Sequence, residues 1–138
     1  MADTRHTKVL IIGSGPDALL CRYKSGRRNL SSDDQITLEW AGASAHYHAA
    51  MMWTVLTGKP KPEHHAHFEA AKAALTACED AMITGNTFGD GFEAHTKVMD
   101  EAGLARHRLN ACGYTLGARF SPSWMDGEMF YDGNSHVI

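Results

Sequence analysis

The sequence lacks closely spaced cysteines and long apolar runs. Its three cysteines, Cys21, Cys78 and Cys112, lie far apart and form no Cys-x-x-Cys motif. A disulfide framework or a structural zinc site needs more cysteines in closer pairs, so we expect reduced, buried thiols in a cytoplasmic protein. No run approaches the roughly 20 apolar residues of a membrane span. Residues 13–16 also interrupt the apolar start that a signal peptide would need, so we expect no membrane association.

A surplus of positive charge is also missing. The 13 Lys and Arg residues are outnumbered by 16 Asp and Glu residues, for a formal net charge of −3. Nucleic-acid-binding domains display a basic patch on a basic domain. The short basic run at residues 22–28 is soon followed by Asp33 and Asp34, which is typical of a solvated turn. We therefore expect no nucleic-acid partner.

What the chain does contain is enough apolar material for one domain with a core, because 43% of its 138 residues are hydrophobic. Short apolar runs bounded by glycine and polar residues predict strands at residues 8–12, 36–41 and 45–55. The Gly-Ala-Ser sequence at residues 42–44 predicts the turn of a hairpin between the last two.

Two helices are predicted after these strands. Pro62 suits a first helical turn, and apolar residues follow it at spacings of three and four. Thr87 and Asp90 form a capping-box pair, which predicts the start of the second helix. Gly89 and Gly91 each cost about 1 kcal/mol relative to alanine, so we expect a soft first turn there.

In the last third of the sequence, the apolar residues show no clear helical or strand periodicity. From Arg106 the chain is rich in glycine and aromatic residues, and we expect irregular structure. Residues 131–138 resemble the beginning of a further strand, as if the chain were cut. The order of elements predicts an α+β fold in which a mostly antiparallel sheet is covered on one side by two helices.

The first sixteen residues resemble the start of bacterial thioredoxin reductases. Gly13-Ser-Gly-Pro-Asp-Ala18 satisfies the G-x-G-x-x-A form of the dinucleotide fingerprint. Glu39 follows at a distance suited to a ribose-binding acid. This resemblance implies a flavin- or dinucleotide-binding oxidoreductase fragment as one alternative, with the strands at residues 8–12 and 36–41 parallel across a helix. The redox cysteine pair of those reductases is missing, and residues 21–34 are poor in helix formers.

A second resemblance covers residues 13–134. The motifs Ser14-Gly-Pro-Asp-Ala18, Thr37-Leu-Glu-Trp-Ala-Gly42 and Tyr47-His-Ala-Ala-Met-Met-Trp-Thr54 resemble, in order, the opening turn and the paired active-site strands of the pita-bread family. This family includes creatinase, prolidase, and Xaa-Pro and methionine aminopeptidases. The resemblance implies an incomplete, truncated pita-bread half-domain over residues 14–138. Residues 1–16 would be the leader that resembles thioredoxin reductase.

The resemblance also implies which positions would hold metal. Metallopeptidases of this family bind two divalent ions with two aspartates, one histidine and two glutamates. Glu39 stands at the first aspartate position, Ala50 at the second and Tyr114 at the histidine position, while both glutamates would lie beyond Ile138. We therefore expect neither a metal site nor a cofactor on this chain.

Ectoine hydrolase-type members, which with creatinase form the metal-free branch of the family, resemble the chain most. The similarity lies in residues 37–42 and in Ala-Cys-Gly-Tyr-Thr-Leu-Gly at residues 111–117. Such a member would hydrolyse the C–N bond of a small cyclic amidine with a carboxylate, acting as nucleophile or as base for water. Glu39 is the candidate, and a solvent-facing strand glutamate is the alternative. Trp53 replaces the usual arginine, and we expect the chain to be inactive alone.

Other residues are candidates for the same site. Tyr114 is expected to hydrogen-bond a carboxylate or the leaving nitrogen, and Asp126 to receive a cationic ring; with Glu39 they form the predicted catalytic set. Arg119 suits a two-pronged contact with a substrate carboxylate, and Trp124 an aromatic wall. The predicted substrate-binding residues are Tyr47, His48, Arg119 and Trp124.

Histidines are frequent, with nine in the chain. His46 and His48 are predicted to share one strand face and to point into a cleft. His64 and His67 are three residues apart at a helix start, which fits a transition-metal site or, more simply, a solvated polar surface. His95, on the apolar face of the second helix, is predicted to be a half-buried core residue.

The expected partners are a small zwitterionic substrate, ectoine- or creatine-like, and a second copy of the chain. The complete fold buries one face of each half-sheet against the other half. Apolar area left uncovered would favour a homodimer, at about 25 cal/mol per Å². A non-catalytic remnant protein is the third alternative.

Overall fold

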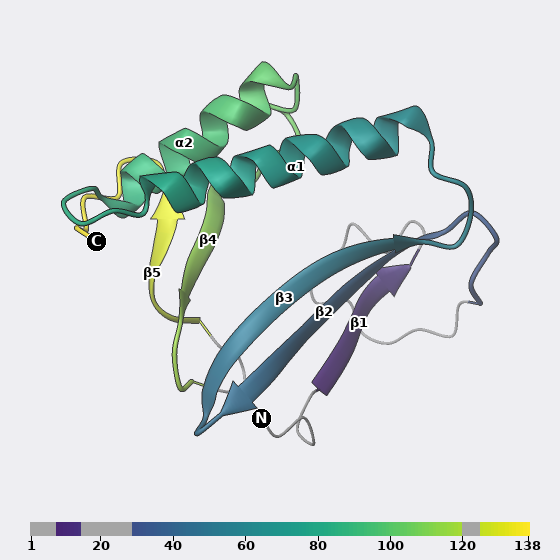
Figure 1. The fold of residues 1–138 in the computed structure, drawn as a ribbon, viewed down its shortest axis with the longest axis horizontal. Coiled ribbons are helices and arrows are strands. Elements are labelled where there is room, and N and C mark those ends of the chain that lie inside the picture. Colours follow the sequence, from purple (N-terminus) through teal and green to yellow (C-terminus); the bar gives the residue numbers. More distant parts are fainter. Residues whose placement is uncertain (1–7, 15–28, 120–124) are drawn as a thin grey trace. The chain divides into compact units, whose positions relative to one another are not determined.

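The computed structural model describes residues 8–14, 29–119 and 125–138 (Figure 1). The elements of these residues are, in order, β1 (Lys8–Ser14), β2 (Gln35–Ser44), β3 (Tyr47–Leu56), α1 (Pro62–Ala81), α2 (Phe88–Glu101), β4 (Ala111–Leu116) and β5 (Met125–Tyr131). The chain divides into two compact units: Met1–Pro60 with Gly117–Trp124, and Lys61–Leu116 with Met125–Ile138. Strands β1, β2 and β3 belong to the first unit; both helices and the β4–β5 pair belong to the second.

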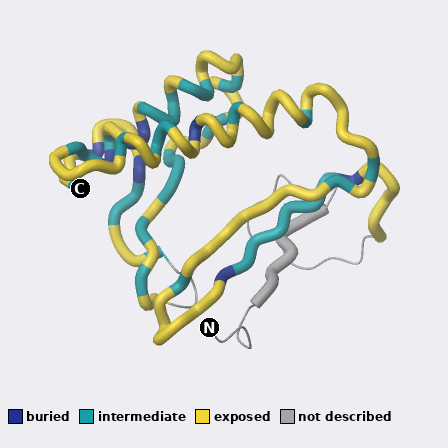
Figure 2. Tube along the Cα trace, viewed as in Figure 1, coloured by how far each residue is buried: buried dark blue, intermediate teal, exposed yellow. Residues whose placement is uncertain are grey.

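The first unit contains an antiparallel sheet in the order β1-β2-β3. The predicted strands at residues 36–41 and 45–55 are confirmed as a hairpin, in which Gln35 faces Leu56 and Ser44 faces Tyr47. Strand β2 is central, so it is hydrogen-bonded on both sides. Its neighbour β3 is exposed along most of its length, as the yellow tube in Figure 2 shows.

The turn of this hairpin differs from the prediction. Residues 42–44 continue the β2 ladder, and the turn consists of Ala45 and His46, whose φ angles are 47° and 70°. Two-residue hairpin turns of this type need positive φ at both positions, where glycine and asparagine are usual. Alanine and histidine gave no such signal. The predicted pairing of His46 with His48 on one strand face is also wrong, because His46 belongs to the turn.

The pairing of β1 decides against a dinucleotide-binding unit. β1 runs antiparallel to β2, with Leu10 opposite Glu39. A dinucleotide-binding βαβ unit requires its first two strands to be parallel and joined by a crossover. The flavin-binding alternative is therefore wrong, and Glu39 is not a ribose ligand. The predicted division of the chain at residues 14–16 stays a prediction.

Both predicted helices are confirmed in the second unit. α1 starts at Pro62, and the ring of His64 accepts a hydrogen bond from the backbone N–H of Lys61 at 3.2 Å. α2 starts after the capping box: the Thr87 hydroxyl accepts from the Asp90 N–H at 3.1 Å, and Asp90 Oδ2 accepts from the Thr87 N–H at 2.7 Å. The hydrogen bonds that the Thr87 N–H and hydroxyl donate to the Asp90 carboxylate lower the pKa of Asp90. Neither helix of the described residues is long and apolar enough to cross a membrane.

Strands β4 and β5 form an antiparallel pair where irregular structure was predicted, so that prediction is wrong. Their sequences contain glycines and lack the alternation of apolar and polar residues that is typical of a strand. A Cβ atom at Gly127 would lie 2.8 Å from Thr115 Oγ1, and one at Gly113 would lie 3.4 Å from the Phe130 ring. The missing side chains therefore leave room for neighbours, which a periodicity argument cannot detect.

The core of the second unit is a cluster of Phe88, Phe92 and Phe130, where α2 packs on β4 and β5 (Figure 2). The rings of Phe88 and Phe130 are 4.6 Å apart between centroids. Gly91 permits this contact, because a Cβ atom there would lie 2.8 Å from the Phe130 ring. α1 packs on α2, and the last residues return to α2: the Phe88 N–H donates to His136 O at 2.9 Å. The described residues thus form an α+β fold of two antiparallel sheets and two helices.

Candidate active site

Glu39 lies at the middle of the central strand of the first sheet. It faces Leu10 of β1 and Met52 of β3, and its side chain is partly buried. Backbone hydrogen bonds on both sides of β2 hold this position more firmly than an edge strand would. A carboxylate placed here has a defined direction relative to the sheet, which a catalytic group requires.

Ala50, the second predicted metal-ligand position, lies on the same face of the sheet. It is directly opposite Ala41, and Ala41 is two residues from Glu39. Residues two apart on a strand share a face, and so do directly opposed residues, so Glu39 and Ala50 are diagonal neighbours. A carboxylate at residue 50 would lie beside Glu39 on this face, but the methyl group of alanine offers no oxygen ligand. The residues present therefore do not fit the dinuclear metal centre that the family implies.

Tyr47 and His48 begin the neighbouring strand β3. Tyr47 is exposed, whereas His48 is partly buried. The His48 N–H donates to the carbonyl oxygen of Gly117 at 3.4 Å, and His48 Nδ1 lies 3.4 Å from the same oxygen. This contact connects the start of β3 to the segment that carries Arg119, which is exposed. Trp124 lies outside the described residues.

Tyr114 and Asp126 belong to the β4–β5 pair of the second unit. Tyr114 faces Met129, and Asp126 follows Met125, which faces Leu116. Both side chains are exposed. The structure therefore brings Tyr114 and Asp126 onto one small sheet, and Glu39, Tyr47 and His48 onto another. Their union in a single site stays a prediction.

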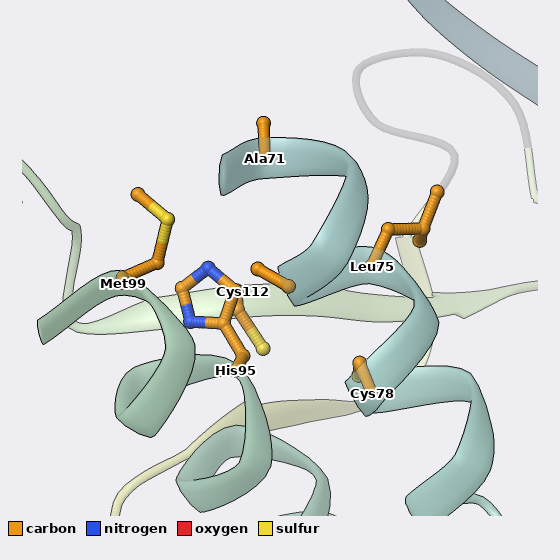
Figure 3. Close-up of a pocket in the computed structure, with 7 residues that line it drawn as sticks. Ala71, Leu75, Cys78, His95, Met99 and Cys112 are labelled. Carbon is orange, nitrogen blue, oxygen red and sulfur yellow. The ribbon is translucent and has the colours of Figure 1, made fainter. Parts of the chain in front are cut away.

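A pocket of about 220 Å³ in the second unit was not predicted from the sequence. Figure 3 shows Ala71, Leu75 and Cys78 on α1, His95 and Met99 on α2, and Cys112 on β4 around it. His95 is half-buried, as predicted, and its Nδ1 is buried without a hydrogen-bond partner among the described residues. Burial lowers the pKa of His95, and the nearby charge of Arg108 lowers it further. This side chain is therefore held in its neutral form.

Cys78 and Cys112 line this pocket from α1 and β4, and each affects the pKa of the other. Burial raises the pKa of both thiols, that of Cys112 to about 12, and the neighbouring sulfur of Cys78 adds to the shift at Cys112. The sequence predicted buried thiols. It offered no signal that they line one pocket, because the two residues lie on different elements, 34 positions apart.

Comparison of the chain with known proteins identifies its family. The family model described as metallopeptidase family M24 matches residues 4–135. The ectoine hydrolase of Halomonas elongata is 33% identical over 94 residues, which are 66% of this chain and 23% of that protein. The uncharacterized hydrolase/peptidase y4tM of Sinorhizobium fredii is 29% identical over 98 residues, which are 70% of this chain and 24% of that protein. The chain thus spans about a quarter of the length of the curated relatives it matches.

Solved structures show the same fold at lower identity. The dipeptidase PepE from Mycobacterium ulcerans has a TM-score of 0.82 at 24% identity, covering 94% of this chain and 34% of that one. The prolidase from Pyrococcus furiosus has a TM-score of 0.81 at 15% identity, covering 94% of this chain and 37% of that one. These likenesses confirm the pita-bread fold, of which the chain spans about a third of the length. Because the family model matches nearly the whole chain, the protein belongs to metallopeptidase family M24.

Proposed function

We propose that this chain is part of a hydrolase that opens the C–N bond of a small zwitterionic compound, an ectoine-like cyclic amidine, with Glu39 as the reacting carboxylate. The observation that carries the proposal is the pair of positions on one sheet face, where Glu39 is present and Ala50 replaces the second acid. One acid of the pattern is thus present, while the ligand set for two metal ions is incomplete. The identity to an ectoine hydrolase supports the same substrate class.

The chemistry needs one carboxylate and a means of holding a charged ring. Glu39 would attack the amidine carbon or remove a proton from the attacking water. Protonation of the leaving nitrogen would complete C–N cleavage, and we assign the hydroxyl of Tyr114 to a hydrogen bond with that nitrogen. Asp126 would pair with the cationic ring.

Substrate binding is proposed for residues that flank these groups. Arg119 offers a planar guanidinium for a two-pronged contact with the substrate carboxylate. Trp124 would supply an aromatic wall for the cationic ring. Tyr47 and His48 lie at the start of β3, and the contact of His48 with Gly117 supports their placement near Arg119.

A metal-dependent Xaa-Pro peptidase is the second candidate within the family. The likeness to dipeptidase and prolidase structures favours it, but that likeness shows only the fold. Two bridging metal ions require carboxylate and histidine ligands around a shared hydroxide. Ala50 lacks an oxygen ligand, and tyrosine at residue 114 is a poor substitute for histidine. We therefore favour hydrolysis without a metal pair.

Binding is the readout for this proposal, because we expect the chain alone to show no turnover. Ectoine would be titrated into the ¹⁵N-labelled protein, and the Kd taken from chemical-shift changes. We expect Glu39→Gln to weaken binding about tenfold or more, since a hydrogen bond to a charged group contributes about 1.5–3 kcal/mol. Glu101→Gln, an exposed glutamate at the end of α2, is the matched control and should leave the Kd unchanged.

The same experiment distinguishes the alternatives. Equal Kd values for wild type and Glu39→Gln would exclude Glu39 from the site. Binding of an Xaa-Pro dipeptide that appears only with added Mn²⁺ would favour the peptidase. Absence of binding to ectoine, creatine and Xaa-Pro dipeptides in the folded protein would support a non-catalytic remnant.

A further inference from the structure

We propose that the pocket of the second unit is a binding site for a small, uncharged aromatic molecule that carries one hydrogen-bond acceptor, such as a carbonyl oxygen. Its lining comes from one unit alone, from α1, α2 and β4 (Figure 3). Glu39, Tyr114 and Asp126, the residues proposed for hydrolysis, are not part of this lining. The two proposals therefore stand on different residues.

The pocket has room for one aromatic ring. Its volume of about 220 Å³ compares with the roughly 150 Å³ of an engineered apolar cavity that binds benzene. Leu75 at its lining is 59% exposed, and Ala71 is exposed as well, so the pocket opens to solvent beside α1. A ring with a short substituent therefore fits and has a route of entry.

Apolar and sulfur-containing side chains form the walls of the pocket. Ala74 is buried, and Cys78 and Cys112 pack against the aromatic cluster of the core. Both thiols are neutral at pH 7, because burial raises the pKa of each. Met99 adds a thioether, which makes favourable contacts with aromatic rings, whereas a free thiol behaves as a small apolar group. These walls therefore suit an aromatic ring.

His95 is the strongest hydrogen-bonding side chain of the lining. Its ring is neutral, because burial and the charge of Arg108 lower its pKa. Its Nδ1 is buried and has no hydrogen-bond partner among the described residues. Since a buried N–H without a partner is less tolerated than a buried lone pair, we assign the ring proton to Nε2. The Nε2–H group is then the donor that this ring offers to an acceptor atom of the ligand.

A charged ligand would find no counter-charge in this pocket. The lining consists of apolar side chains, two neutral thiols and a neutral imidazole. Arg108, the cation that acts on His95, is already bonded to Asp100: its Nε donates to Oδ1 at 2.7 Å and its Nη2 to Oδ2 at 3.2 Å. Moving an unpaired carboxylate or ammonium group from water into apolar surroundings is costly, so the pocket selects uncharged molecules.

The test is a titration with three matched ligands. Acetophenone has an acceptor oxygen on an uncharged ring, ethylbenzene has a similar size without the oxygen, and benzoate bears a charge. Each is titrated at pH 7 into the full ¹⁵N-labelled chain, and the Kd is taken from the NMR chemical shifts. We expect acetophenone to bind, with shift changes centred on Leu75, Cys112 and the imidazole Nε2 of His95. Benzoate should not bind.

Two alanines of α1 provide a matched pair of variants. Ala71→Leu adds carbons at the lining and should weaken acetophenone binding about tenfold or more, because the displaced ligand atoms lose their apolar contacts. Ala73→Leu adds the same carbons at an exposed position outside the lining and should leave the Kd unchanged. Equal Kd values for the two variants, with folding checked by circular dichroism, would overturn the proposal.

His95→Leu tests the hydrogen bond by itself. Acetophenone should bind about two- to tenfold more weakly to this variant, the range of one net hydrogen bond, whereas ethylbenzene should bind as before. An equal change for both ligands would contradict the role of His95. Benzoate binding as tight as that of acetophenone, or no acetophenone binding by the folded wild type, would overturn the site. Glu39→Gln should leave the acetophenone Kd unchanged, so either proposal can fail without the other.

Discussion

Glu39 owes its position to the strands on either side of it. β1 and β3 both pair with β2, so the residue at the middle of β2 cannot shift without breaking hydrogen bonds on two sides. The diagonal neighbour on the same face is Ala50. In our proposal, this one position separates the chain from the metal-binding pattern of its family, because a methyl group in place of a carboxylate removes a ligand without disturbing the sheet.

Cys112 shows how burial changes the acidity of a thiol. Its pKa is raised to about 12 from an ordinary value near 9.0, mainly because burial disfavours the thiolate. Because the folded protein favours the neutral thiol, this group stabilises the fold fully at pH values below the pKa that it has in the unfolded chain. That contribution is then lost as the pH rises through the folded value. The affected window is therefore about pH 9 to pH 12.

We predict that the reduced protein loses thermal stability between pH 9 and pH 12 more steeply than a Cys112→Ala variant does. The variant has no thiol to ionise at this position, so its pH profile should be flatter. Melting temperatures from circular dichroism, recorded under dithiothreitol, would show the difference. Parallel profiles for the two proteins would mean that Cys112 titrates equally in the folded and unfolded states.

Helix α2 begins with a complete capping box, but its first turn contains glycines, which have a low helix propensity. Thr87 and Asp90 satisfy backbone groups of the first turn. Gly89 lies so close to Asn134 that a Cβ atom would be 2.8 Å from its carbonyl oxygen, and Gly91 is equally close to the Phe130 ring. The two glycines are therefore required by packing, and the soft first turn expected from propensity is held by contacts with the last residues of the chain.

We predict that Gly91→Ala destabilises the second unit by about 1–3 kcal/mol, the usual effect of overpacking a core. In an uncrowded helix the same change stabilises by about 1 kcal/mol, so the sign of the effect reports on the contact with Phe130. Urea unfolding gives the free energy. Gly42→Ala, where no atom lies within 4 Å of the added carbon, is the control and should change stability little. A stabilised Gly91→Ala protein would show that the Phe130 ring moves aside.

Strand β3 exposes several large apolar side chains in the described structure. Met51, Met52 and Trp53 of β3 are each at least half exposed. Among the described residues, β3 is an edge strand of the first sheet, and it contains no charged residue between Tyr47 and Leu56 that would discourage pairing. A second copy of the chain is an occupant of matching chemistry, because the same apolar strand can pair with itself across a twofold axis.

We predict concentration-dependent self-association that Met51→Lys weakens by roughly tenfold or more in Kd, because a charge would lie in the apolar contact. Sedimentation velocity over a range of protein concentrations measures it. Ser44→Lys adds the same charge to an exposed position at the end of β2 and serves as the control. A wild-type chain that remains monomeric at high concentration would contradict the predicted homodimer.

Some features of this protein follow from local sequence. The start of α2 was predicted from Thr87 and Asp90, because a capping box involves residues only three apart. Strands β2 and β3 were predicted from continuous apolar runs, and the half-buried state of His95 from the spacing of its neighbours. The order of motifs also pointed to the pita-bread family. Each of these signals lies within a few residues of the feature it predicts.

Other features required the tertiary structure. The turn at Ala45 and His46 is set by the register of two strands, since neither residue favours positive φ. The β4–β5 pair depends on glycines that admit neighbouring side chains. Cys78 and Cys112 line one pocket from a helix and a strand, and the shared face of Glu39 and Ala50 depends on strand register. Such features arise from packing between residues distant in the chain, which no local pattern records.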